Sequence, residues 1–133
     1  MDSIAPKGQT VGDAYLSLLA DRGVDYLFAN SGTDFAPLIE GFVKASSEGR
    51  KTPTPVTVPH ENVAVSMAMG YFLVSGRAQA VMVHVSVGTG NSINGLLNAS
   101  RGEIPILMSA GRTPITESGI HGTRDIDIHW PQE

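Results

Sequence analysis

The sequence has 133 residues, which is the length of one domain or of part of one, and it contains no cysteine. Its 9 Lys and Arg residues against 13 Asp and Glu residues give a net charge of −4, so it has no basic excess with which to bind the phosphates of a nucleic acid. The absence of cysteine excludes a disulfide scaffold, a thiolate zinc site and a cysteine nucleophile.

The first pattern along the chain is helical. Residues 11–22 carry apolar side chains at helical spacing. Thr10 before them is a good N-cap, Asp13 lies in the first turn, where the helix dipole favours an acid, and Gly23 is a natural end. We therefore predict a helix over 11–22.

Beyond Gly23, short β-prone runs alternate with further helical patterns. The predicted elements are, in order, a strand over 24–29, a helix over 35–48, a strand over 56–58, a helix over 60–76, a strand over 80–87, a helix that follows a turn at 88–91 and stops near Gly102, and a strand over 104–110. The helix over 60–76 is apolar nearly all round, so we expect it to be buried on every side, with a second subunit or domain covering it.

Strands that alternate with helices predict an α/β fold: an open, mostly parallel sheet with helices on both faces, in a flavodoxin-like three-layer α/β/α arrangement. Ligands of such sheets bind beyond the carboxyl ends of the strands. The residues that follow the predicted strands are 30–34, 60–62, 84–91 and 111–114. We expect the functional residues among them.

The two ends of the chain and its most apolar stretch bear on location. The first residues are polar and include Asp2, unlike a signal peptide, and the apolar stretch over 63–74 is shorter than the ~20 residues of a membrane span. We predict a cytoplasmic protein with no membrane partner. Residues 130–133 resemble the opening of a helix, so we expect 1–133 to be one domain, an incomplete fragment of a longer chain.

Glu61 opens the most apolar helix, directly after a predicted strand end. One interpretation is an acid that complements the helix N-terminus. The other is a carboxyl group that apolar neighbours desolvate, which suits it to exchange a proton with a bound heterocycle. Both interpretations stay open on the residues alone.

Gly88, Thr89 and Gly90 precede a helix and form either a tight turn or a backbone surface for a flat ligand. The segment is not a P-loop, because no Gly-Lys-Ser/Thr follows, and it is not a dinucleotide fingerprint, because a third glycine is missing.

His84 is either a core histidine or a proton donor that points into a cleft. His60, His121 and His129 lack the spacing of metal ligands, so we predict no zinc site and no metal held by this chain.

Thr33 and Asp34 are interpreted first as a helix cap, and Arg112 and Arg124 as candidate anion contacts.

Two motifs carry a family resemblance. They are His-Glu-x-x-Ala-x-x-Met-Ala-x-Gly-Tyr from His60 and Gly-Thr-Gly-Asn over 88–91. Together with Ser75-Gly76-Arg77 and Pro105-Ile106-Leu107, they resemble the N-terminal pyrimidine-binding domain of thiamine diphosphate-dependent decarboxylases and acetohydroxyacid (acetolactate) synthases. The resemblance runs from about residue 9 to about residue 111.

The resemblance implies a role for Glu61 as the acid that hydrogen-bonds N1′ of the cofactor's aminopyrimidine ring. A carboxyl group at N1′ promotes loss of a proton from the 4′-amino group, and this activates the cofactor. Gly32, Thr89, Gly90 and Asn91 would line the cofactor site. The family chemistry is decarboxylation of a 2-keto acid or ligation of the product to a second carbonyl compound.

Residues 84–91 most resemble the matching segment of benzoylformate decarboxylases. That likeness implies that His84 transfers protons and contacts the substrate, and that Thr33 contacts the substrate carboxylate. Ser31 stands where the family usually has Pro, and Thr123 and Arg124 stand where acetohydroxyacid synthases have a Phe-Gln pair.

By resemblance, the diphosphate and Mg2+ are held by a separate C-terminal domain, whose Gly-Asp-Gly…Asn-Asn segment this sequence lacks. The active site would form between subunits of a homodimer or homotetramer, and these residues alone would be inactive. Two alternatives stay open: an acetolactate synthase-like acyl-transferring carboligase with an anionic acceptor, and a non-catalytic flavodoxin-like binding domain.

Overall fold

The structure is a computed structural model that describes residues 8–112. The elements are α1 (Val11–Asp21), β1 (Tyr26–Asn30), the 3-10 turn η1 (Thr33–Phe35), α2 (Ala36–Ser47), β2 (Thr54–Thr57), α3 (Glu61–Ser75), β3 (Gln79–Val83), α4 (Val85–Arg101) and β4 (Ile106–Ala110). The predicted alternation of helices and strands is confirmed, and most boundaries differ by one to three residues.

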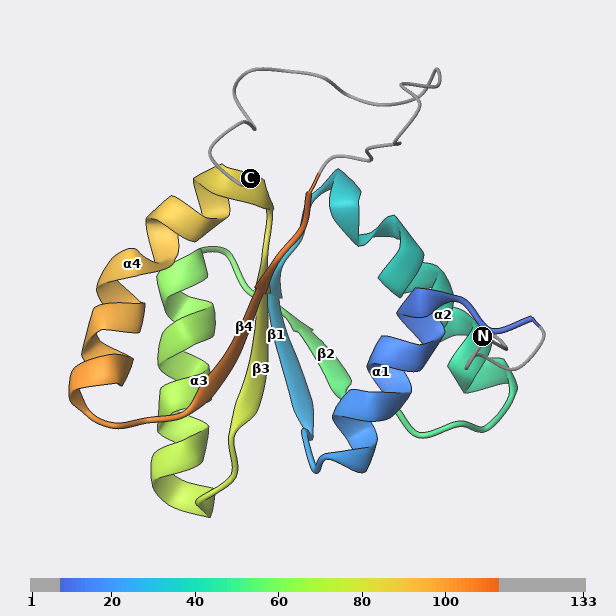
Figure 1. Cartoon of the computed structure of the whole chain (residues 1–133), viewed down its shortest axis with the longest axis horizontal. Coiled ribbons are helices and arrows are strands. Elements are labelled where there is room, and N and C mark those ends of the chain that lie inside the picture. The colour runs from blue at the N-terminus through green and yellow to red at the C-terminus, as the bar shows by residue number, and fades with distance from the viewer. Residues whose placement is uncertain (1–7, 113–133) are drawn as a thin grey trace, which may run out of the picture.

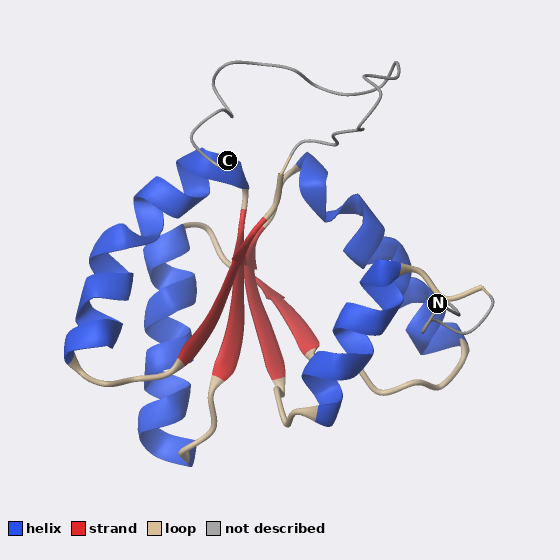
Figure 2. Ribbon diagram, in the orientation of Figure 1, coloured by secondary structure: helices blue, strands red, loops and turns tan. Residues whose placement is uncertain are grey.

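The four strands form one parallel sheet in the order β2-β1-β3-β4. Helices α1 and α2 cover one face and α3 and α4 cover the other (Figures 1 and 2). The chain leaves β1 toward the β2 edge and leaves β3 toward the β4 edge, so the strand order reverses between β1 and β3. In an open α/β sheet, that reversal opens a crevice at the carboxyl ends of the two strands.

Each face of the sheet has its own apolar cluster. One packs Leu16 and Leu19 of α1 against β1, and the other packs Ala64 and Val65 of α3 against Phe28 and the strand β3. Every residue of β3 is buried, as its unbroken apolar run predicts. The strand-order reversal therefore lies beside the most deeply buried strand of the sheet.

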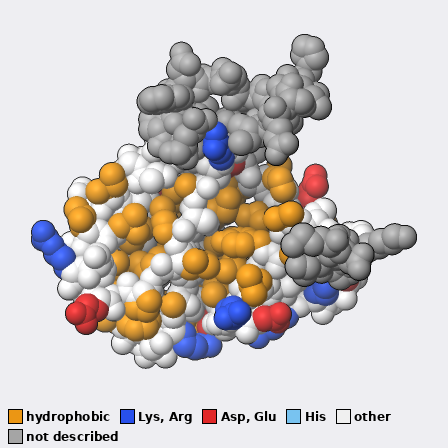
Figure 3. All heavy atoms as spheres, viewed as in Figure 1, with side chains coloured by type: hydrophobic (Ala, Val, Ile, Leu, Met, Phe, Trp, Pro, Cys, Tyr) orange, Lys and Arg blue, Asp and Glu red, His pale blue; other side chains and the backbone are white. Residues whose placement is uncertain are grey.

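Helix α3 forms as predicted, but residues 8–112 cover only part of its apolar surface, so its burial by a second subunit or domain stays a prediction. Helix α3 buries one side, but Leu73 is 70% exposed and Val74 is 91% exposed, and Val63 and Met67 are also exposed. Apolar side chains gather on the face seen in Figure 3, with the charged ones nearer its rim. An all-apolar helix needs cover on every side, whereas the described residues supply only the sheet and α4.

A second correction concerns the segment after β3. We expected a strand to Val87 and then a turn, but β3 ends at Val83 and α4 starts at Val85. Val85 adopts a left-handed conformation, with φ of 39°, which turns the chain within one residue. Hydrophobic periodicity contains no information on such a turn, since Val favours extended backbone.

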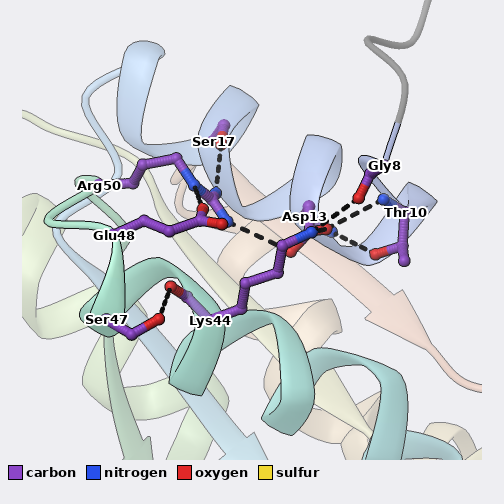
Figure 4. Close-up of polar contacts among 8 residues, drawn as sticks. All are labelled: Gly8, Thr10, Asp13, Ser17, Lys44, Ser47, Glu48 and Arg50. Atoms are coloured by element: carbon purple, nitrogen blue, oxygen red, sulfur yellow. Dashed lines mark hydrogen bonds and ion pairs between the residues drawn. The ribbon is translucent and has the colours of Figure 1, made fainter.

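Helix α1 begins as predicted, with a capping box in which Thr10 and Asp13 exchange hydrogen bonds. Asp13 also binds Lys44 and Arg50, which lie at the end of α2 and just beyond it (Figure 4). This one carboxylate therefore joins the two helices of its face. Within residues 8–112 no helix is long and apolar enough to cross a membrane.

Candidate active site

Glu61 lies at the first residue of α3 and is 7% exposed. Its Oε2 accepts a hydrogen bond from Asn91 Nδ2 at 3.2 Å, and His60 Nδ1 lies 3.8 Å from the same oxygen. No hydrogen bond to Oε1 comes from any described residue. The carboxyl group is thus fixed through one oxygen and retains the other for a further partner.

The start of α3 is held by its own cap and by α4. His60 Nδ1 accepts from the backbone N–H of Asn62 at 3.1 Å, so His60 is the N-cap, a role that the sequence analysis missed. The side chain of Asn62 accepts from the backbone N–H of Gly95 in the middle of α4, at 3.1 Å. These bonds fix Glu61 relative to α4, which carries Asn91.

Gly88 leaves bare backbone beside the Glu61 carboxyl group. A Cβ at this position would lie 2.9 Å from Val83 Cβ and 3.3 Å from Glu61 Oε1. Contacts that close are not tolerated between packed atoms, so the residue has to be glycine for α4 to reach the acid.

The Gly-Thr-Gly-Asn segment lies inside α4 rather than in the predicted turn before it. Thr89 Oγ1 donates to the carbonyl of Val85 at 2.9 Å, so its hydroxyl hydrogen satisfies its own helix. Gly90 is exposed and, with Thr89, lines a cleft of about 540 Å³. The other residues that line this cleft are Ser86, Ile93, Ala110, Gly111 and Arg112.

His84 is the N-cap of α4, and its side chain is 34% exposed, so it is not a core histidine. Its Nδ1 lies 2.6 Å from Oδ1 of Asp34, whose side chain is 5% exposed. Gly32 approaches the His84 ring so closely that a Cβ at this position would overlap Nδ1. The predicted site residues Gly32 and His84 are therefore in contact.

The predicted cap at Thr33 and Asp34 is wrong. The N-cap of α2 is Phe35, which makes no side-chain bond, while Thr33 and Asp34 form the 3-10 turn before it. Asp34 lies within the segment 30–34 where functional residues were expected, but its contact with His84 was not predicted. Thr33 is exposed at the same edge of the sheet. Arg124, His121 and His129 lie outside the described residues.

The geometry groups an acid, a histidine and bare glycine backbone at the strand ends. Residues 9–130 match the family described as thiamine pyrophosphate enzyme, N-terminal TPP binding domain. The chain belongs to this family. The α/β fold expected from the resemblance is confirmed.

Relatives of this family are similar over most of the chain. The chain is 36% identical over 98 residues to a putative acetolactate synthase large subunit, IlvX, of Mycobacterium tuberculosis, which covers 74% of this chain and 18% of that protein. It is 31% identical over 104 residues to a benzoylformate decarboxylase of Pseudomonas aeruginosa, covering 78% of this chain and 18% of the relative. The chain thus spans about a fifth of the length of these relatives.

Solved structures share the fold. A benzoylformate decarboxylase from Polynucleobacter necessarius superposes with a TM-score of 0.69 at 22% identity, covering 93% of this chain and 22% of the other. A putative thiamin diphosphate-dependent enzyme from Mycobacterium smegmatis gives a TM-score of 0.67 at 28% identity, covering 83% of this chain and 20% of the other.

The residues present fit the pyrimidine half of thiamine diphosphate. An aminopyrimidine requires one carboxyl oxygen for its ring nitrogen and a flat surface for its face. Glu61 is 7% exposed and its Oε1 has no hydrogen bond from the described residues, and Gly88 leaves backbone beside it. Among residues 8–112, no group of three His, Asp or Glu side chains could hold a metal ion.

Proposed function

We propose that this domain holds and activates the aminopyrimidine ring of thiamine diphosphate in an enzyme that decarboxylates a 2-keto acid or ligates the product to a second carbonyl compound. The observation that carries the proposal is Glu61: a nearly buried carboxyl group, fixed by Asn91 through one oxygen, with the other oxygen unbonded among the described residues. Family membership and the benzoylformate decarboxylase relative support the class of reaction.

Glu61 shares a proton with ring nitrogen N1′ through Oε1. Asn91 holds the second oxygen, so the carboxyl group keeps its orientation while the proton moves. Glu61 is only 7% exposed, and low access of water strengthens a hydrogen bond of this kind. Thiamine diphosphate, when bound, would supply the nucleophilic carbon and the electron sink that decarboxylation requires.

The other site residues bind and move protons. His84 exchanges a proton with the reacting molecule, and Thr33 contacts the substrate carboxylate through its hydroxyl group. Gly32, Thr89 and Gly90 supply backbone and side-chain surface to the cofactor, with Asn91 beside them.

The whole protein requires more than this domain. In the proposal, a second domain binds the diphosphate and Mg2+, and the active site lies between subunits of a homodimer or homotetramer in the cytoplasm. The exposed apolar side chains of α3 are consistent with cover by another part of the assembly. Residues 1–133 alone are then inactive.

An acetolactate synthase-like carboligase is the second candidate. Its support is the 36% identity to the putative acetolactate synthase subunit and the position of Arg112 on the 540 Å³ cleft, where a cation can bind an anionic acceptor. Assays of 2-keto acids with and without a second carbonyl compound separate the two: free aldehyde indicates the decarboxylase, and a coupled product indicates the carboligase.

The test of the proposal is Glu61→Gln in the full-length enzyme. Glutamine retains the shape and the bond to Asn91 but cannot share an acidic proton, so we expect kcat to fall about 10²- to 10⁴-fold. Proton exchange at C2 of the bound cofactor, followed by NMR, should slow in parallel.

The matched control is Glu40→Gln, which changes an exposed acid of α2. It should leave kcat and C2 exchange unchanged. Near-normal exchange in Glu61→Gln would refute the assignment, whatever its effect on stability.

A further inference from the structure

A second carboxylate reaches the crevice from the end of β1. Asp34 follows β1 and His84 follows β3, the two neighbouring strands between which the strand order reverses. Their side chains meet at 2.6 Å between Asp34 Oδ1 and His84 Nδ1. Burial of the Asp34 side chain, at 5% exposure, protects this bond from competition with water.

Backbone on two sides restricts the pair. A Cβ on Gly111 would lie 1.5 Å from Asp34 Oδ2, and a Cβ on Gly32 would fall against the His84 ring. Both glycines thus allow a side chain to lie directly on their backbone, where no other residue would fit.

Val85, directly after His84, has a strained backbone conformation. Val85 is β-branched and 2% exposed, and yet it takes a φ of 39°. A left-handed Val costs about 1–3 kcal/mol and persists only where the surroundings enforce it. The turn it makes ends β3 and starts α4 within one residue of His84.

The chemistry of the pair determines where the histidine proton lies. An ionised carboxylate only accepts hydrogen bonds, so Nδ1 carries the hydrogen that the 2.6 Å contact requires. In a neutral imidazole with the hydrogen on Nδ1, Nε2 bears the lone pair and is the nitrogen that takes up a proton. Asp34 Oδ2 has no hydrogen-bond partner among the described residues. A buried oxygen without a partner lowers the stability of the fold, so stability alone does not account for a carboxylate at this position.

We propose that Asp34 is a positioning residue: it holds His84 Nδ1–H and thereby makes Nε2 the nitrogen that exchanges a proton with the reacting molecule. The inference rests on the proposed function, in which His84 transfers protons, and it deepens that function by adding a residue that neither touches substrate nor was indicated by any sequence motif.

The direct test is Asp34→Asn in the full-length enzyme. Asparagine has the same shape, but its amide group can donate to Nδ1, which places the hydrogen on Nε2 instead. We expect kcat to fall about 10- to 100-fold, as when the orienting partner of a functional histidine is lost. The KM for the 2-keto acid and the Kd for thiamine diphosphate, from titration calorimetry, should stay within about twofold.

A double-mutant cycle with His84→Ala separates positioning from an independent contribution. When His84 is absent, Asp34 has nothing to hold, so Asp34→Asn should lower kcat by less than about twofold in the His84→Ala background. Multiplication of the two single losses would overturn the inference.

The proposed function and the inference fail in different ways. If His84→Ala costs activity and Asp34→Asn does not, only the inference is wrong. If His84→Ala costs nothing, both the role of His84 and the inference are wrong, while Glu61→Gln still tests cofactor activation separately.

A control variant guards against a folding defect. Asp13→Asn removes a buried carboxylate from the other face of the sheet and should leave kcat unchanged.

The tautomer of His84 can also be measured directly. In the unsubstituted enzyme, the imidazole ¹⁵N shifts of labelled histidine report the tautomer, with the signal assigned by its loss in His84→Ala. The hydrogen on Nδ1 is expected, and a hydrogen on Nε2 would overturn the inference.

Discussion

Three buried carboxylates lie in two regions of this domain, and they differ in how completely they are bonded. Asp13 is 1% exposed between α1 and α2, where Oδ2 accepts from the backbone N–H of Thr10 at 2.9 Å and from Lys44 at 3.0 Å, and Oδ1 lies 3.4 Å from Arg50. At the strand ends, Glu61 has one hydrogen-bonded oxygen and Asp34 has one buried oxygen without a partner among residues 8–112.

Burial alone therefore does not identify a functional acid. All three side chains are withdrawn from water, but Asp13 has its acceptor capacity satisfied within one face of the molecule (Figure 4). An acid whose bonds are complete stabilises the fold. An acid that retains an unbonded oxygen has acceptor capacity that the fold leaves unused, at a cost in stability.

The position of the Glu61 carboxyl group can be disturbed without changing Glu61 itself. Gly88→Ala places a Cβ 2.9 Å from Val83 Cβ, and α4 has to move away from Glu61. We expect a loss of about 1–3 kcal/mol in the free energy of unfolding, from overpacking, and a fall in kcat of about 10-fold or more. Urea unfolding and steady-state kinetics of the full-length enzyme measure the two effects.

Gly90→Ala is the matched control, because no atom lies within 4 Å of a Cβ at that position. It should change stability far less than Gly88→Ala. Equal losses in the free energy of unfolding for both variants would show that the close approach of α4 to Val83 and Glu61 is not what Gly88 protects.

A smaller effect is expected from Asp13→Asn, and it should appear in stability only. The substitution leaves Lys44 and Arg50 without their shared partner, so the midpoint of thermal unfolding should fall by more than in Lys44→Met, which removes one of the two cations. A fall in kcat with no loss of stability would contradict the separation of the two regions.

The sequence predicted the order of helices and strands in this domain better than the contacts between their side chains. Alternation of helical and strand patterns predicted the parallel sheet and the position of Glu61 after a strand end, because both depend on local order in the chain. Asp34 and His84 are 50 positions apart in the sequence, and they meet because β1 and β3 are neighbours in the sheet. No local pattern encodes that order.

Local conformation misled the prediction where one residue adopts a rare state. Val85 has a side chain typical of strands, but its left-handed conformation ends β3 and begins α4. The Gly-Thr-Gly-Asn segment therefore lies within α4. Asp34 reads as a cap from its residue type, although its side chain turns to His84 instead of to α2. In both cases tertiary contacts at the crevice override the local preference.

The smallest effect, a pH dependence, tests whether Asp13 is structural. The backbone N–H of Thr10 and then the ammonium group of Lys44 hold the pKa of Asp13 well below its ordinary value, while burial opposes them. A carboxyl group with a depressed folded-state pKa contributes stability above its unfolded pKa, about 3.9, and loses it as the pH falls through the folded value.

The difference in unfolding midpoint between the unsubstituted protein and Asp13→Asn should therefore be constant from pH 7 to about pH 5. It should shrink below about pH 4, as protons bind the unfolded Asp13 first. Measurement of thermal unfolding of both proteins between pH 7 and pH 3 checks this sign. A difference that grew on acidification would mean that the Asp13 carboxylate opposes folding, and the contrast between a bonded structural acid and the unbonded crevice acids would then be lost.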